Sequence, residues 1–357
     1  MWQSQRIQKL LDIEHPIIHA PMAGASSAEM VAAVSNAGCL GSFGASPLSV
    51  DQLRDTIRRI RELTKNAFNI NLFASATEAV DHSAPMGSDY QKLLSGYHQE
   101  FGLGDLPKPK SIFGPAAAQL EVLIEEKVPV ISFHFGIEAA QVNAIHAAGL
   151  KVLCSATTVE EALHLDQLGV DAIIAQGTEA GGHRGTFLGP ADQGLIGTLA
   201  LVPQIVDRVS VPVIAAGGIM DGRGIVACAA LGASAVQIGT AFLGCTESPI
   251  ADIWRQKLTS ASASDTMVTW AISGKPARGL RNRYITEVES LEENLLPYPL
   301  HYSMSGPLRS AATKAGNPDF LGMWSGQGVG LFRSMPAAEF INTLNKEIAS
   351  LRKGLST

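Results

Sequence analysis

The feature that most constrains the fold is a repeated alternation of short apolar runs with segments of helical spacing. The runs are typical of buried strands and lie at residues 16–20, 39–43, 68–73, 128–135, 150–155, 170–176, 211–216 and 234–238. Val128–Phe135 and Val211–Ala216 are apolar on both faces, as expected of parallel strands covered by helices. Alternation of this kind implies a parallel α/β sheet, and its repetition through eight strands favours a closed (β/α)8 TIM-type barrel over an open sheet.

The rest of the chain predicts how the barrel is elaborated. Helices are expected at residues 27–36, 49–65, 115–127, 138–148, 159–168, 199–209 and 224–231. The chain has 357 residues, which exceeds the roughly 250 of a single barrel. We expect residues 1–247 to form the barrel with an insertion at about 74–110, residues 248–322 to form a lid or small second lobe, and residues 323–357 to return to the barrel, with a terminal helix at 337–353.

Composition and charge argue against several classes of function. A net charge of −6 offers no basic stripe for nucleic acid. The four cysteines form no C-x-x-C pair and lie in apolar surroundings, which favours reduced thiols in a cytoplasmic protein and argues against a metal site. The N-terminus has no apolar core, so we predict no signal peptide. Gly224–Thr246 is uncharged and long enough to imitate a membrane span, but its glycines favour a helix followed by a strand, and we expect no membrane partner.

Glycine-containing loops follow the last two predicted strands, at the end of the barrel where active sites lie. Gly217 and Gly218 follow the strand at 211–216, and the strand at 234–238 runs into Gly239 and Thr240. Glycines let backbone N–H groups approach an anion, and helix N-termini favour negative charge. One such loop could be a simple turn, but two at these strands predict a phosphate-bearing ligand. No strand is followed by G-x-G-x-x-G and no P-loop occurs, so FMN fits better than a dinucleotide.

The loop after the strand at 170–176 is the most informative segment. Gln176 ends the strand, where an amide can hydrogen-bond a ring system, and Gly181 with Gly182 allows close backbone approach. His183 is then presented over the barrel mouth, and histidine is the side chain most able to change charge near neutral pH. A lone histidine is usually structural, but this setting predicts a catalytic role.

Three further residues are candidates with structural alternatives. His134 follows the strand at 128–135 and could bind an anionic substrate, or it could be a buried histidine between aromatic neighbours. Asn71 lies among apolar residues, where a polar amide needs a partner such as a cofactor. Met22 follows the first strand and could contact a flavin, although methionine is more often a core residue.

These residues together resemble the nitronate monooxygenases, formerly called 2-nitropropane dioxygenases, over nearly the whole chain. The motifs that carry the resemblance are His15–Ile18 with Ala20–Gly24, Asn69–Leu72, Gln176–Arg184, Ala215–Ile219 and Gln237–Thr240. The Glu-Ala-Gly-Gly-His core within the third of these is specific to the superfamily. Asn317–Phe320 and Trp324–Gly328 look like the closing motif of class I members, and Tyr298 with Tyr302 resembles the aromatic residues that line their substrate pocket.

The resemblance implies FMN as cofactor and alkyl nitronates as substrates, with propionate 3-nitronate foremost. It implies cofactor contacts from Met22, Asn71, Gln176, Gly181, Gly217, Gly218, Gln237, Ile238, Gly239 and Thr240. His183 is implied as the catalytic residue, and His134, Tyr298 and Tyr302 as substrate-binding residues. The family oxidises nitronates with O2 to a carbonyl compound and inorganic nitrogen oxides, a detoxifying reaction that needs no external reductant.

Two roles for His183 and two rival functions stay open at this stage. Protonated His183 could stabilise a nitronate anion, and neutral His183 could remove a proton from a nitroalkane. Related flavin barrels share the glycine-histidine loop but take electrons from NAD(P)H, as quinone or enoyl-thioester reductases. A non-catalytic flavin- or phosphate-binding barrel is the other rival. The sequence leaves open whether the protein is a monomer or a homodimer.

Overall fold

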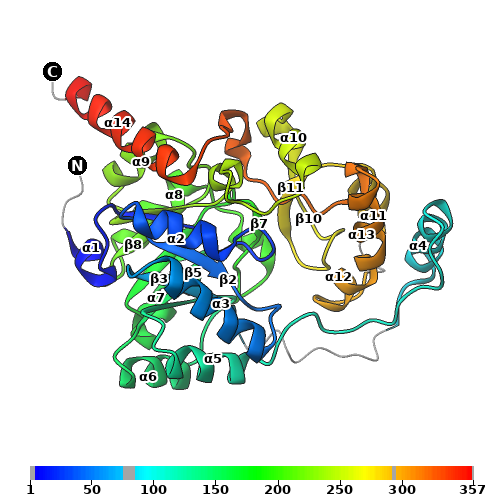
Figure 1. Cartoon of the computed structure of the whole chain (residues 1–357), viewed down its shortest axis with the longest axis horizontal. Coiled ribbons are helices and arrows are strands. Elements are labelled where there is room, and N and C mark those ends of the chain that lie inside the picture. Colours follow the sequence, from blue (N-terminus) through cyan, green and yellow to red (C-terminus); the bar gives the residue numbers. More distant parts are fainter. Residues whose placement is uncertain (1–4, 75–84, 292–294, 356–357) are drawn as a thin grey trace.

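The computed structural model describes residues 5–74, 85–291 and 295–355 and has a parallel barrel at its centre (Figure 1). Its strands are β1 (Ile17–His19), β2 (Gly41–Gly44), β3 (Phe68–Phe73), β4 (Val130–His134), β5 (Lys151–Ala156), β6 (Ala172–Gln176), β8 (Val213–Ala216) and β9 (Ala235–Ile238). They form an 8-stranded sheet in the order β1-β9-β8-β6-β5-β4-β3-β2. A parallel bridge between Ile18 and Leu40 joins its two edges and closes the barrel. The predicted (β/α)8 class is therefore confirmed.

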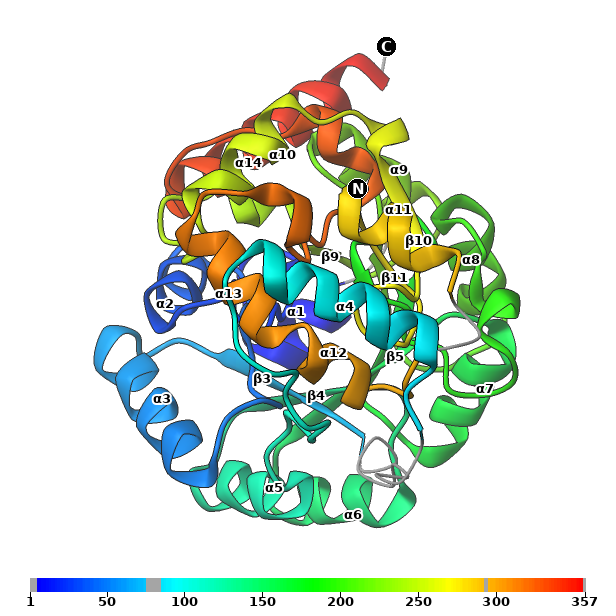
Figure 2. The same cartoon turned by 90° about the vertical axis from the view of Figure 1, so that its right-hand side faces the viewer.

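Helices surround the barrel, as the alternating pattern predicts (Figure 2). They are α2 (Ala28–Asn36), α3 (Val50–Leu63), α5 (Ala116–Glu125), α6 (Ala139–Ala147), α7 (Val159–Leu168), α8 (Thr198–Val206) and α9 (Gly222–Ala230). The terminal helix α14 (Ala337–Leu355) packs against α2 and α9. At the end opposite the predicted site, α1 (Arg6–Leu11) packs Ile7 and Leu11 against buried residues of the strands.

Local sequence signals set several helix ends. Ser27 accepts a hydrogen bond from the backbone N–H of Met30, so it caps α2 as expected from its position. Ser49 and Gln52 form a reciprocal capping box at the start of α3. Gly169 ends α7 in the left-handed region at φ +83°, a conformation that glycine adopts without steric cost. These caps satisfy backbone groups that the helix itself leaves unpaired.

A second group of elements covers the carboxyl ends of the barrel strands, and we call it the lobe. It comprises α4 (Ser88–Glu100), α10 (Asp252–Ser260), β10 (Thr266–Thr269), β11 (Ala277–Leu280), α11 (Arg283–Glu289), α12 (Leu300–Met304) and α13 (Gly306–Lys314). Short 3-10 helices accompany it and the adjoining loops: η2 (Ala191–Gly194), η3 (Thr240–Gly244), η4 (Ala263–Asp265), η6 (Pro318–Phe320) and η7 (Gln327–Leu331). Figure 2 looks onto the lobe with the barrel behind it.

The lobe has a hydrophobic core of its own, and α4 belongs to it. Tyr90, Leu94 and Tyr97 of α4 are buried together with Tyr284 and other residues of the later segment. The Tyr90 and Tyr284 hydroxyls are 2.8 Å apart, and Tyr97 donates to Glu287 Oε2 at 2.6 Å. The expected insertion at 74–110 therefore supplies a helix to the lobe, while residues 75–84 lie outside the described residues.

β7 (Gly182–His183) connects barrel and lobe. It pairs antiparallel with β11, which pairs in turn with β10, so the loop after β6 becomes the edge of a 3-stranded sheet. All four cysteines are buried and free, as predicted. Among the described residues, no helix is long and apolar enough to cross a bilayer.

Candidate active site

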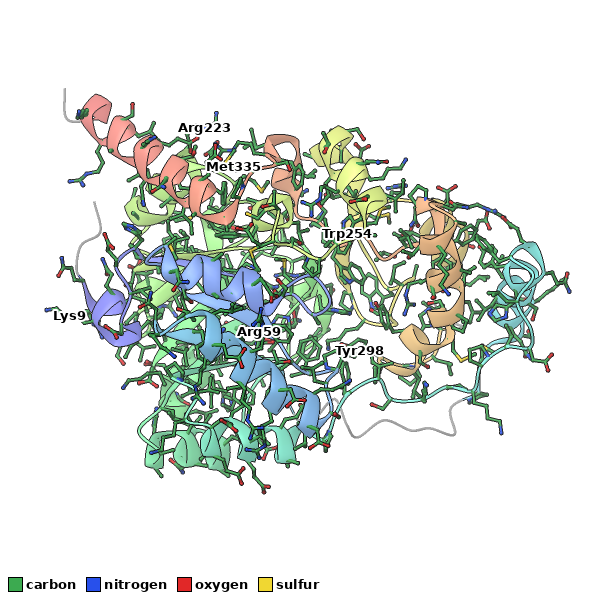
Figure 3. The ribbon with its side chains drawn as sticks, viewed as in Figure 1. Lys9, Arg59, Arg223, Trp254, Tyr298 and Met335 are labelled. Carbon is green, nitrogen blue, oxygen red and sulfur yellow. The ribbon has the colours of Figure 1, made fainter. Side chains whose placement is uncertain are left out.

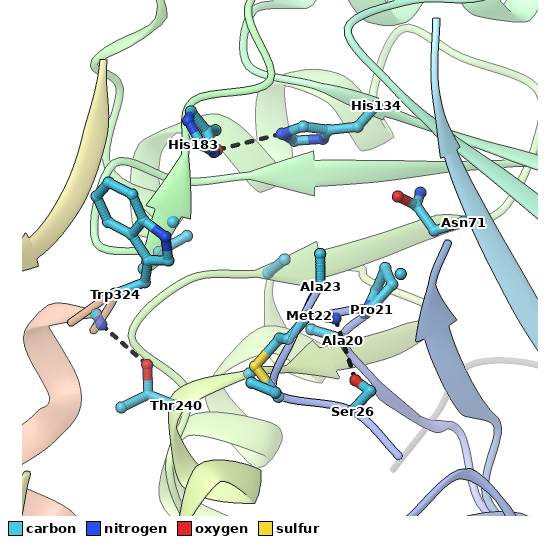
Figure 4. A pocket seen from close by; sticks show the side chains of 18 of the residues that line it. Ala20, Pro21, Met22, Ala23, Ser26, Asn71, His134, His183, Thr240 and Trp324 are labelled. Atoms are coloured by element: carbon cyan, nitrogen blue, oxygen red, sulfur yellow. Dashed lines mark hydrogen bonds between the residues drawn. The ribbon is translucent and has the colours of Figure 1, made fainter. Parts of the chain in front are cut away.

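A cavity of about 660 Å³ lies between the carboxyl ends of the barrel strands and the lobe. The barrel contributes strand ends and glycine loops, and the lobe contributes aromatic side chains such as Trp254, Tyr298 and Tyr302. Figure 3 labels Trp254 and Tyr298, and Figure 4 shows barrel residues such as Met22, Asn71 and His183. Trp324, Gly326 and Gly328 of the C-terminal segment complete it. None of the described lining residues is an aspartate, glutamate, lysine or arginine, so the cavity wall carries no permanent full charge.

The structure brings almost all of the predicted site residues to this cavity. Those that line it are Met22, Asn71, His134, Gln176, Gly181, His183, Gly217, Gly218, Gln237, Gly239, Thr240, Tyr298 and Tyr302. Ile238 is the exception, because its side chain is buried in the hydrophobic core of the barrel. The cavity is thus formed by loops that are far apart in the sequence but share the carboxyl end of one parallel barrel.

His183 sits where the two parts of the molecule meet. As part of β7 it pairs with Ala277 of β11, and the next residue, Arg184, donates its backbone N–H to Pro276 at 2.8 Å. The His183 ring is 4.9 Å from the Tyr298 ring and 5.3 Å from the Trp324 ring, centroid to centroid. Its Nε2 lies 2.9 Å from the hydroxyl of Ser273, a lobe residue that the sequence did not single out. The histidine is therefore held in two ways: its backbone by pairing with β11, and its ring by the contact with Ser273.

His134 and Gln176 both hold the carbonyl oxygen of His183. That oxygen accepts from His134 Nε2 at 3.2 Å, drawn in Figure 4, and from Gln176 Nε2 at 3.0 Å. Gln176 Oε1 in turn accepts from the N–H of Gly185, and His134 Nδ1 lies 3.0 Å from the Ser155 hydroxyl. Both ring nitrogens of His134 are thus engaged by the protein, which agrees with the structural alternative considered for it and not with a direct contact to substrate.

Two charged residues of the same loop also bond to the protein itself. Arg184 is fully buried and donates to the carbonyl oxygens of Gln176, Gly177 and Gly194 at 2.6, 2.7 and 3.1 Å. Glu179 accepts from the backbone N–H and the hydroxyl of Thr198, the first residue of α8. A carboxylate at a helix N-terminus is favourable. These contacts hold the loop in place. They also engage both charged side chains, so His183 is the titratable side chain of the loop that can act on a ligand.

Burial keeps the histidines of the cavity neutral near pH 7. Burial lowers the pKa of His183 to about 3, with smaller contributions from His134 and Lys275. Burial likewise lowers the pKa of His134 to about 4. The Lys275 ammonium lies 4.4 Å from the centre of the Phe135 ring, and burial lowers its pKa as well. Of the two roles considered for His183, this environment favours the neutral imidazole.

The glycine loops leave room for an anion beside backbone N–H groups. Gly217 and Gly218 have φ values of +120° and +70°, which side chains other than glycine rarely adopt. Among the described residues, the N–H groups of Gly218 and Gly239 donate to no backbone oxygen. A Cβ on Gly181 would lie 2.7 Å from the backbone nitrogen of Gly326. Free backbone N–H groups beside these glycines suit a phosphate group, the ligand that the sequence predicts at the two loops.

Several residues at the cavity were not identified from the sequence. Ser273, Lys275 and Trp254 lie in the later segment, whose pattern gave no register relative to the barrel. Trp324 was noted only as part of a terminal motif, yet it lines the cavity beside His183. Among the described residues, the indole N–H of Trp254 and Oε1 of Gln237 are buried polar atoms without a protein partner. Both residues line the cavity, where a ligand could satisfy these atoms.

Comparison with known proteins agrees with this geometry. The family model described as nitronate monooxygenase matches residues 4–347. A probable nitronate monooxygenase from Staphylococcus aureus (strain Newman) is 40% identical over 350 residues, which are 98% of each chain. A nitroalkane oxidase from Streptomyces ansochromogenes superimposes with a TM-score of 0.88 at 37% identity, over 98% of this chain and 99% of that one.

Two further structures show the same architecture. FabK from Thermotoga maritima superimposes with a TM-score of 0.77 at 32% identity, over 98% of both chains. The enoyl reductase domain of MlnA from Bacillus amyloliquefaciens has a TM-score of 0.70 at 14% identity over 99% of both chains, a likeness of fold alone. The match of the family model over nearly the whole chain and the identity to its relatives decide the assignment: this chain belongs to the nitronate monooxygenase family and is a flavin-dependent oxidoreductase.

Proposed function

We propose that this protein uses FMN to oxidise alkyl nitronates with O2 to a carbonyl compound and nitrite or nitrate, with propionate 3-nitronate as the foremost substrate and detoxification in the cytoplasm as the role. The observation that carries the proposal is the placement of neutral His183 in a cavity without charged lining side chains, beside the phenols of Tyr298 and Tyr302. The two phenols can donate hydrogen bonds to a small anion and so position it without a permanent counter-charge.

The residues present fit FMN. Backbone N–H groups of Gly217, Gly218, Gly239 and Thr240 would hold the phosphate, because the two glycine loops face the cavity. The unpartnered Oε1 of Gln237 would accept from a ring N–H, and Met22, Asn71, Gln176 and Gly181 would lie along the ring system. Bound FMN would supply the electron acceptor.

The lobe residues would bind the substrate. Burial keeps the pKa of Tyr298 well above its usual value, so this phenol stays protonated and can donate a hydrogen bond to an oxyanion. Tyr302 stacks under the Arg309 guanidinium, whose carbon lies 3.6 Å from the ring centre. His134 would act indirectly in this proposal, since it holds the carbonyl of His183.

The likeness to FabK favours one alternative, an NAD(P)H-dependent reductase of the same barrel superfamily. The reductase takes electrons from NAD(P)H and the proposed enzyme takes them from its substrate, so the flavin absorbance spectrum in the presence of NADH distinguishes the two. A reductase should lose its flavin absorbance within seconds of anaerobic mixing with NADH, whereas the proposed enzyme should keep it.

The decisive experiment is oxygen uptake by the purified yellow protein on addition of propionate 3-nitronate without NAD(P)H. Uptake with the nitronate is expected for the wild type, and His183→Asn should lower kcat/KM for a neutral nitroalkane, which must first lose a proton, by about 10²–10⁴-fold while retaining flavin. A flavin-loaded protein that is inert to nitronates but bleached by NADH would favour the reductase. Full activity in His183→Asn would remove that residue from the mechanism.

A further inference from the structure

Ser273 approaches the candidate catalytic histidine from the lobe. It lies in the turn between β10 and β11, is fully buried, and is 90 positions away from His183 in the sequence. The turn is held by backbone hydrogen bonds from Ser273 and Gly274 to the carbonyl of Trp270, at 3.2 and 2.8 Å. The pairing of β11 with β7, in which Ala277 lies opposite His183, places the turn that carries Ser273 beside the histidine. The contact between Ser273 and His183 is therefore built into a rigid part of the fold.

The hydrogen bonds of this serine decide where the proton of the histidine lies. The Ser273 hydroxyl donates to the carbonyl oxygen of Lys275 at 3.0 Å, and it also accepts from the backbone N–H of Lys275 at 3.4 Å. A hydroxyl has one proton to donate. Since that proton is used on Lys275, the oxygen must accept from His183 Nε2, 2.9 Å away. The neutral ring then carries its proton on Nε2.

The opposite arrangement satisfies fewer groups. If Ser273 donated to His183 Nε2, the carbonyl of Lys275 would lose this hydrogen bond, and no other donor to it occurs among the described residues. Buried polar groups in native proteins are nearly always paired. The hydrogen bond made by one ring nitrogen of a histidine also sets which of its two nitrogens carries the proton. The Nε2-protonated tautomer is therefore preferred, and Nδ1 keeps its lone pair.

The Nδ1 atom is also the ring nitrogen that the protein leaves free. Among the described residues, no hydrogen bond is made to Nδ1 of His183, and the residue lines the cavity. The groups around the ring are the aromatic rings of Tyr298, Trp324 and Phe135, with Lys275 behind Phe135. None of them is a carboxylic acid, and the Tyr298 phenol keeps its proton because burial raises its pKa.

We propose that Ser273 is a positioning residue that fixes His183 as the Nε2-protonated tautomer, so that Nδ1 removes the α-proton of a neutral nitroalkane. In that step the C–H bond breaks, its electron pair remains on the substrate to give the nitronate anion, and the proton moves to Nδ1. The resulting imidazolium is stabilised by its Nε2–H bond to Ser273. The inference rests on the proposed function, because the nitronate formed is the compound that function oxidises.

The tautomer can be measured without any turnover. Protein labelled with nitrogen-15 on histidine distinguishes a protonated ring nitrogen from one with a lone pair by NMR, and His183→Asn identifies the signal. We expect His183 to be protonated on Nε2 in the wild type and in Ser273→Thr, and to show a mixture of tautomers in Ser273→Ala. A wild-type His183 protonated on Nδ1 would overturn the proposal, whatever the activity.

Activity on two substrates tests the consequence. With nitroethane, kcat/KM of Ser273→Ala should fall at least tenfold, while with ethyl nitronate, which needs no deprotonation, it should change less than about threefold. Ser273→Thr should recover most of the loss. Ser35→Ala is the matched control, because Ser35 is also buried and its hydroxyl also bonds one carbonyl and one backbone N–H.

The outcomes separate this inference from the function on which it rests. A wild type that oxidises ethyl nitronate but not nitroethane refutes the inference and leaves the proposed function intact. A wild type inert to both refutes the proposed function, and the NMR result then still decides the tautomer. Equal losses on both substrates in Ser273→Ala would mean a structural role only and would overturn the inference.

Discussion

The barrel wall and the lobe wall of the cavity are built on different physical principles. On the barrel wall, Gln176 and His134 both donate a hydrogen bond to the carbonyl oxygen of His183 and so hold the loop that carries it. On the lobe wall the aromatic side chains Tyr298 and Tyr302 lie in the cavity, and their hydroxyls bond no protein group among the described residues. The polar side chains of the barrel wall around His183 are thus satisfied by the protein. Among the described residues, the N–H groups of Gly218 and Gly239, Oε1 of Gln237 and the hydroxyls of the lobe wall remain open to a ligand.

This difference suggests that the barrel wall binds the cofactor and the lobe wall selects the substrate. A wall of backbone N–H groups and glycines binds a phosphate-bearing cofactor in one fixed place, at little entropic cost. A wall of aromatic rings with free hydroxyls adapts to small substrates and donates hydrogen bonds to them. The two walls meet at His183, whose backbone is held by the barrel and whose Nε2 faces the lobe. Changes on the two walls should therefore have separable effects.

The largest effect is expected on the barrel wall, from Gly181→Ala. The added Cβ would lie 2.7 Å from backbone atoms of Ser325 and Gly326, which cannot move away as a flexible side chain can. Overpacking of this kind costs about 1–3 kcal/mol, and we expect most of the bound flavin to be lost as well. Flavin absorbance per protein and the thermal midpoint measure both. In Gly104→Ala the new Cβ meets nothing within 4 Å, so this control should keep its flavin.

An intermediate effect is expected on the lobe wall, from Tyr298→Phe and Tyr302→Phe. Each change removes one hydrogen-bond donor worth about 1–1.5 kcal/mol, so KM for a nitronate should rise about tenfold with flavin content unchanged. Steady-state kinetics with propionate 3-nitronate measure this. Tyr97→Phe removes a lobe hydroxyl that bonds Glu287 outside the cavity and should leave KM unaltered. Loss of flavin in the two cavity variants would contradict the division between the walls.

The smallest effect near neutral pH is a loss of stability that begins only in mild acid and grows as pH falls. Burial lowers the pKa of His134 and His301 to about 4, below their value of about 6.5 in an unfolded chain. Between these values the unfolded state binds more protons, so stability is complete above about pH 6.5 and falls as pH drops toward 4, by about 1.4 kcal/mol per pH unit for each histidine. Urea unfolding at several pH values measures the slope.

His134→Gln on the barrel wall and His301→Gln in the lobe should each make this decline shallower. If the protein unfolds as one unit, the two variants should lose the same part of the slope. A change confined to His134→Gln would show that the lobe unfolds separately from the barrel.

Much of the barrel could be predicted because its signals are local. The strand expected at 68–73 is observed as Phe68–Phe73, and the helix expected at 159–168 is observed as Val159–Leu168. Continuous apolar runs, helical spacing, caps and glycine ends all depend on neighbours in sequence. The same signals placed His183, Gly217 and Gly218 at the carboxyl end of the strands, where the structure has them around one cavity.

The lobe could be predicted only in outline, because its contacts join segments that are far apart in the chain. Tyr90 of α4 meets Tyr284, 194 positions later, and β7 pairs with β11 across an intervening part of the barrel. A strand of two residues, Gly182–His183, has no period to detect. Arg184 likewise looks like a surface residue in the sequence, yet it is fully buried among carbonyl oxygens.

The sequence by itself determined the class of fold, the family and the set of loops that carry the chemistry, because those depend on local periodicity and on motifs of adjacent residues. The tertiary structure alone decided what each polar group of the site does. His134 is engaged by the protein at both ring nitrogens, and Ser273 accepts the proton of His183 Nε2 because its own proton is committed to Lys275. Hydrogen-bond roles follow from which donors and acceptors meet in space, and that meeting is a property of the folded chain.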